Sequence, residues 1–149
     1  MKKIVSITTL ILLLFNSTGA LYGGWLLITD PSGTTLEISP AVLVHTPFPD
    51  FLVPGVALFA INGILSLVVA MAILTKTHQA SLLVCLQGFL LTGWIVIQYF
   101  WTQVYHPLQA VMGTAGLILI CCGFFLLHLQ KKDELHLQQM LENQSFMHN

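Results

Sequence analysis

Charged residues are scarce in this sequence, and arginine is absent altogether. Five lysines and six acidic residues make up only 7% of the 149 residues, whereas 56% are apolar. A soluble domain carries roughly 25% charged residues, and a soluble globule of this size could not cover its surface with so few. The composition argues against a soluble enzyme, a nucleic-acid-binding protein and a disordered linker, and the length fits one domain, residues 1–149.

Motifs for catalysis are also missing. The sequence contains no phosphate-binding loop, no HExxH motif and no GxSxG motif. Its three cysteines, Cys85, Cys121 and Cys122, include no CxxC pair, and we expect them to be small buried side chains. We therefore expect no catalytic residue, no metal and no cofactor. Enzymatic activity stays open but is the less favoured class.

Four long uncharged segments are present instead, at residues 4–28, 51–74, 80–101 and 108–128. A hydrocarbon core about 30 Å thick needs about 20 apolar residues of helix, and each segment meets that length. Backbone groups in lipid must be satisfied within their own segment, so all four are expected to be helices. The predicted fold is an all-α membrane protein, an up-down bundle of four transmembrane helices.

The five lysines predict the orientation of this bundle. They lie at the N-terminus, in the connection 75–79 and just after the fourth span, at Lys2, Lys3, Lys76, Lys131 and Lys132. Neither residues 29–50 nor residues 102–107 contain a lysine. By the positive-inside rule, both termini are expected in the cytoplasm.

The first segment has a second interpretation. Two lysines, an apolar run and small residues ending at Ala20 also resemble a cleavable secretory signal. Retention is favoured because apolar residues resume after Ala20, and because Tyr22 and Trp25 suit an interfacial aromatic belt. A retained span and a cleaved signal both remain open on the sequence.

The outer loop, residues 29–50, has the signals of an ordered cap. Residues 30–33 read Asp-Pro-Ser-Gly, the residue types of a type I turn. Ser39 followed by Pro40 predicts a short capped helix, and Asp50 is placed to cap the second span. The tail, residues 129–149, either extends the fourth helix or frays after about residue 142.

Polar residues near the outer surface form the first candidate site. The topology gathers six of them near one membrane face: Asp30, His45, Asp50, Gln98, His106 and Gln109. Histidines with carboxylates can bind a metal or shuttle a proton, but no HxH or HxxxH spacing occurs. The favoured interpretation is structural, with the aspartates as turn and helix caps.

Amides inside the spans form the second candidate. The spacing of Gln87, Trp94 and Gln98 places them on one helical face, which we expect to meet Asn16 and Asn62 inside the bundle. Such amides are either interhelical hydrogen-bonding groups or the lining of a polar pocket. Spaced glycines, such as Gly19 with Gly23, indicate close helix contacts, within the bundle or between two copies.

Four stretches of the sequence carry a family resemblance: GGWLLITDPSG (23–33), TPFPDFLVPG (46–55), GWIVIQ (93–98) and HPLQAVMGTAG (106–116). Together they resemble a group of small, uncharacterised bacterial four-span integral membrane proteins, over about residues 21–123. The resemblance implies a bacterial inner membrane and the same four-helix form. It transfers no catalytic residue.

The leading functional hypothesis is a multi-pass protein of the bacterial inner membrane that acts by binding or assembly. Its expected partners are membrane lipid and either another membrane protein or a second copy of the chain, with no nucleic acid. The alternative is a small transporter, or a membrane enzyme handling lipid or quinone, that uses a polar pocket between helices.

Overall fold

The computed structural model describes residues 1–147 and is an all-α bundle, with no strand in that range. Its long elements are α1 (Lys2–Thr29), α4 (Ala80–Thr102) and α5 (Pro107–Met147). The remaining span is built from α2 (Leu52–Ala57), the π-helical segment η3 (Leu58–Ile64) and α3 (Leu65–Leu74). These four stretches are long and apolar enough to cross a membrane. The predicted four-helix bundle is confirmed, with bounds within two residues of the predictions except at the end of α5.

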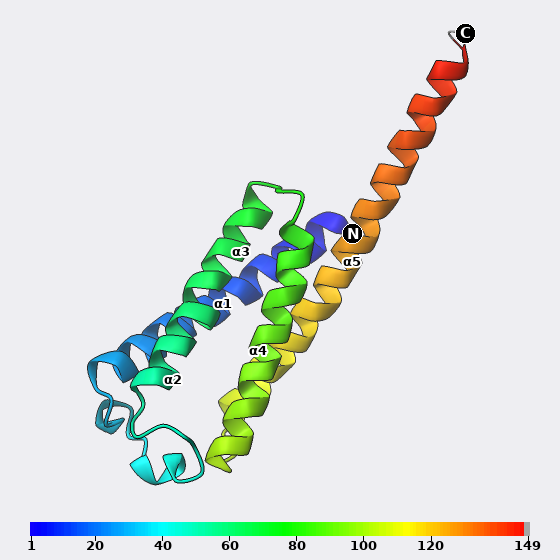
Figure 1. Cartoon of the computed structure of the whole chain (residues 1–149). Helices are drawn as coiled ribbons and strands as arrows, with labels where there is room; N and C mark the ends of the chain where they lie inside the picture. Colours follow the sequence, from blue (N-terminus) through cyan, green and yellow to red (C-terminus); the bar gives the residue numbers. More distant parts are fainter. Residues whose placement is uncertain (148–149) are drawn as a thin grey trace.

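The fourth helix is the longest element of the protein. It runs unbroken from Pro107 to Met147 and leaves the bundle beyond the level of the N-terminus (Figure 1). The predicted tail is therefore an extension of this helix, and the alternative of fraying after residue 142 is wrong. Residues 148–149 of the predicted tail lie outside the described residues.

The helices pack as two pairs. One pair is α1 with the span α2–η3–α3, and the other is α4 with α5, which lie side by side over most of α4 (Figure 1). The pairs join through an apolar core near the middle of the bundle. Leu13, Val69, Val84, Leu91 and Leu119 are its largest members and are almost completely buried.

Glycines bring the helices of each pair close together. On the first pair, a Cβ added to Gly24 would lie 2.8 Å from the backbone N of Phe59, and Gly55 and Gly63 are similarly close to α1. On the second pair, a Cβ on Gly88 would lie 2.7 Å from the backbone N of Ile120. Small residues therefore serve contacts inside the bundle, which is one of the two predicted roles. The predicted pair Gly19 and Gly23 is looser, because each would accept a Cβ at ordinary contact distance.

The outer loop folds into a cap with its own small core. It contains two 3₁₀ turns, η1 (Thr34–Leu36) and η2 (Pro40–Leu43), and Ser39 accepts a hydrogen bond from Ala41 N as an N-cap. Leu27 at the end of α1, Leu43 and Phe51 are buried together. The ring of Phe48 meets that of Trp101 edge-on at 5.2 Å, so the cap also contacts α4. The predicted turn at residues 30–33 and the short helix after Ser39 are confirmed.

Candidate functional site

Asp30 organises the first turns of the cap. Its Oδ1 accepts a hydrogen bond from Ser32 Oγ at 2.6 Å, and its Oδ2 accepts from Thr35 N and Thr35 Oγ1, both at 2.7 Å. These donors, with the Ser32 hydroxyl first, lower the pKa of Asp30 from 3.8 to about 2. The carboxylate is thus a fixed acceptor inside its own loop, and its lone pairs are largely used there.

Three of the other five outer-face candidates, Asp50, His106 and Gln109, also bond within their own segments. Asp50 Oδ1 accepts from Leu52 N, the first amide of α2, at 3.0 Å, although Phe51 rather than Asp50 is the N-cap residue of that helix. His106 Nδ1 accepts from Leu108 N at 3.2 Å, and Gln109 Oε1 accepts from His106 N at 3.0 Å. The bond to His106 Nδ1 satisfies one of the first amides of α5, that of Leu108, since the start of a helix leaves four N–H groups without helical partners. The bond to Gln109 Oε1 satisfies the amide of His106, the residue before the helix. The geometry matches the structural interpretation of these residues.

The outer-face residues do not converge on one point. Among the six predicted residues, the hydrogen bond between His106 and Gln109 is the one that joins two members within the described part of the chain. His45 is exposed on the cap, and Gln98 is half-buried on α4. Residues 1–147 contain no group of three His, Cys, Asp or Glu side chains that could hold a metal.

Amides inside the bundle do converge, in a cluster that we call the polar core: Asn16, Asn62, Ser66 and Gln87. Asn16 Nδ2 donates to the carbonyl of Asn62 at 3.0 Å and to Ser66 Oγ at 2.8 Å. Gln87 Nε2 donates to the carbonyl of Ile61 at 3.3 Å. All four members are at most 2% exposed, so α1, η3, α3 and α4 meet here through buried polar groups. The expectation that Asn16, Asn62 and Gln87 face the bundle is confirmed.

Trp94 and Gln98, the other members of the predicted stripe on α4, lie outside the polar core. Gln98 follows Gln87 by eleven residues, which is about 16 Å along a helix. Trp94 and Gln98 are half-buried in the outer half of α4, outside the polar core. Two hollows on the described surface are also away from the stripe: one lies on the α5 extension, and one between α1 and α5 against Leu12, Phe15, Val111 and Ile118.

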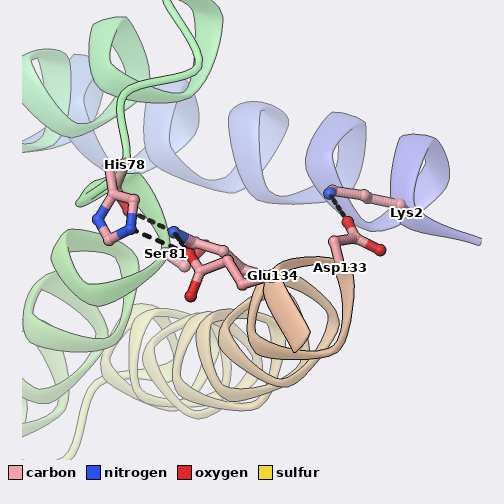
Figure 2. A network of polar contacts seen from close by, with 6 residues as sticks. Lys2, His78, Ser81, Asp133 and Glu134 are labelled. Carbon is pink, nitrogen blue, oxygen red and sulfur yellow. Dashed lines mark hydrogen bonds and ion pairs between the residues drawn. The ribbon is translucent and has the colours of Figure 1, made fainter. Parts of the chain in front are cut away.

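A third polar cluster, which sequence patterns did not single out, lies near the start of α4, whereas the cap contacts the end of that helix. Figure 2 shows the contacts of this cluster. Lys2 Nζ bonds Asp133 Oδ2 at 2.8 Å, and His78 Nε2 lies 3.0 Å from Glu134 Oε1. Gln130 Nε2 also donates to the carbonyl of His78 at 3.0 Å. Helix α5 therefore contacts both the N-terminus and the short connection that precedes α4. Exposed ion pairs of this kind contribute little to the stability, but they show that the N-terminus and the start of α4 both lie beside α5.

The cysteines differ in their surroundings. Cys85 is buried against α5, Cys122 is half-buried and Cys121 is exposed on the outside of the bundle. The expectation of three buried cysteines is therefore wrong for Cys121. Two adjacent residues on a helix point about 100° apart, so Cys121 and Cys122 could not both face the interior fully.

The chain was also compared with known proteins. No family model, curated protein or solved structure matches it.

Proposed function

We propose that this is a multi-pass protein of a bacterial inner membrane that binds or assembles with another membrane component through its outer cap. The observation that carries the proposal is the contrast between bonded polar groups and exposed apolar ones at this end of the bundle. The polar groups around Asp30 are bonded within the cap, while Val44 on the cap is 73% exposed and Tyr105, in the connection between α4 and α5, is 66% exposed. An ordered surface that presents apolar and aromatic side chains is suited to contact a partner.

The proposed orientation places both termini in the cytoplasm. Its support is the clustering of lysines at one end, where Lys2 pairs with Asp133 and the connection holding Lys76 meets α5 through His78. Cytoplasmic segments carry an excess of lysine and arginine, and the cap has none. We also propose that α1 is retained as a span, because Asn16 and Leu13 are buried against three other segments.

Single cysteines test this orientation in a background with Cys85, Cys121 and Cys122 replaced by alanine. In spheroplasts, a membrane-impermeant maleimide should label His45→Cys directly and Gln79→Cys only after the membrane is opened. Both positions are exposed, and neither removes a lysine. Labelling of Gln79→Cys in intact spheroplasts would overturn the orientation and the assignment of the cap to the outside.

Binding through the cap is tested by photo-cross-linking in the native membrane. A photoreactive amino acid at position 44 or 105 should give a discrete protein adduct. The same group at Leu82, an exposed apolar position at the other end of α4, should give only lipid adducts. Lipid adducts alone at all three positions would refute a protein partner at the cap. The groove between α1 and α5 is apolar and supports lipid as a further partner.

A second candidate function is a small transporter, or a membrane enzyme handling lipid or quinone. It is favoured by one observation: Asn62 and Gln87 keep buried side-chain atoms that have no hydrogen-bond partner in the part of the chain that the structure describes. The absence of Asp, Glu, Lys and Arg from the predicted spans weighs against ion or proton pumping. Mass spectrometry of molecules retained by the purified protein tests it. A small molecule lost from Gln87→Leu but kept by His45→Ala would support this function, and no retained molecule would count against it.

A further inference from the structure

The segment η3 departs from regular α-helix at the depth of the polar core. Residues Leu58–Ile64 form a π-helix between α2 and α3, with no proline inside it. A π-helix bonds i to i+5, so each turn is wider and its carbonyls are displaced from their α-helical positions. Two consecutive carbonyls of this segment, those of Ile61 and Asn62, accept hydrogen bonds from the side chains of Gln87 and Asn16. Side chains from two other helices therefore hold η3 in its π form.

Asn62 follows the residue whose carbonyl accepts from Gln87, and it is completely buried. Neither its Nδ2 nor its Oδ1 has a hydrogen-bond partner within the described residues, and Gln87 Oε1 also has none. Asn62 and Gln87 thus leave unpartnered one donor group with two hydrogens and two acceptor oxygens. A buried amide without partners carries the full cost of its desolvation, and hydrocarbon around the bundle offers it no alternative.

The unpartnered amide atoms of Asn62 and Gln87 indicate which kind of ligand would fit. Donors and acceptors are present together, which suits a molecule that can both accept and donate. No Asp, Glu, Lys or Arg lies within the predicted spans to balance the charge of an ion. Water fits this pattern, because buried waters typically make about three hydrogen bonds to otherwise unsatisfied polar groups. We propose that Asn62 and Gln87, beside the π-helix η3, form an internal binding site for water in the middle of the membrane-spanning bundle.

Asparagine is rare enough in this chain for a direct test. Labelling the full-length protein with ¹⁵N-asparagine gives four side-chain signals, from Asn16, Asn62, Asn143 and Asn149. We expect a nuclear Overhauser effect between water and the Asn62 amide hydrogens, with the sign of a long-lived bound molecule. Asn16 is the matched control, because it lies at the same depth and its Nδ2 already donates to two protein acceptors. Loss of one signal in Asn62→Leu assigns the Asn62 resonance.

Thermal unfolding of the same variant separates the remaining outcomes. If water satisfies Asn62, Asn62→Leu removes those hydrogen bonds and should lower the unfolding midpoint by about 3 °C. If the site is dry, the leucine replaces an unsatisfied amide and should raise the midpoint. A missing water signal with a raised midpoint overturns the proposal in favour of a dry core. A missing water signal with a lowered midpoint overturns it in favour of direct pairing of Asn62 with Gln87. If Asn62→Leu does not fold, the signal in the unmodified protein, assigned through the backbone, still decides.

Discussion

The two helix pairs of the bundle reach close contact by different means. Between α4 and α5, regular helices meet through Gly88, Gly116 and Gly123. Two side-chain bonds cross between them in the described residues: Ser81 Oγ donates to Gln130 Oε1 at 3.3 Å near the start of α4, and Cys85 Sγ makes a weak contact with Ile120 O at 3.9 Å. Between α1 and its partner span, glycines make the outer part of the contact, while Asn16 bonds to the backbone farther in. The pair formed by α1 and its partner span is also the one that contains the π-helical segment η3. The amide hydrogens of Asn16 and Gln87 satisfy carbonyls of this irregular segment, while the Asn62 side chain has no partner in the described residues.

The connections within the two pairs also differ, because the first pair has a long, folded loop and the second a short link. A short link, residues 103–106, joins α4 to α5, and its polar bonds cap the helix that follows. The first pair is joined by the cap, with a buried core around Phe51 and a bonded carboxylate at Asp30. The contact between α1 and its partner span thus contains buried hydrogen bonds, whereas the contact between α4 and α5 depends mainly on the close approach of glycines.

The largest effect should come from disturbing the α4–α5 contact. Gly88→Val would place a side chain against the backbone N of Ile120, so the two helices must separate. We expect a loss of about 3 kcal/mol in the free energy of unfolding, measured by reversible denaturation in mild detergent. Gly93→Ala is the control on the same helix, since nothing lies within 4 Å of its added Cβ. It should be neutral or stabilising by up to about 1 kcal/mol. Equal effects of the two variants would contradict the close contact at Gly88.

A smaller effect is expected on the α1 pair, where neighbouring glycines provide the comparison. Gly24→Ala brings a Cβ to 2.8 Å from Phe59 N, whereas Gly23→Ala meets only the end of the Leu58 side chain at 3.7 Å. We expect Gly24→Ala to cost about 1–2 kcal/mol in the same assay, and Gly23→Ala to leave the stability unchanged or slightly raised. A larger loss for Gly23→Ala would show that α1 turns a different face to its partner.

The smallest effect concerns Asp30 and appears only in acid. Its pKa is about 2 in the folded cap against 3.8 ordinarily, so the folded state binds the proton less readily. The carboxylate therefore stabilises the cap fully above pH 4, and this contribution is lost as the pH falls towards 2. NMR titration of the Asp30 carboxyl should give the lowered midpoint, and Asp30→Asn should remove the acid dependence of Thr35 amide exchange. A midpoint near 3.8 would mean that the bonds to Ser32 and Thr35 are not maintained.

Much of the fold could be predicted because its signals are local. The length of each apolar run sets the span, and Ser39 and Asp50 bond to amides two residues away, so their caps depend on little else. The inward placement of Asn16, Asn62 and Gln87 was also predictable, since lipid offers amides no partner.

Features set by distant residues were not predictable. The π-helix η3 has no local marker, because the side chains that hold its carbonyls come from Asn16 and Gln87, 46 and 26 residues away. The closer fit of Gly24 than Gly23 depends on the rotation of α1 against Phe59. The sequence places Asp30, Asp50 and His106 near the same end of the predicted bundle, but each of them bonds inside its own segment.

Because α5 is one continuous helix, a tilt of its membrane-spanning part would also move the part that extends beyond the bundle. About 28 Å of helix extends past the predicted span, residues 108–128, and is continuous with it. A span answers a change in bilayer thickness by tilting. A tilt of about 10° would carry the far tip of such an arm sideways by about 5 Å. Leu137 and Leu141 are exposed on this arm, so whatever contacts them would sense the thickness of the surrounding bilayer without touching the bundle itself.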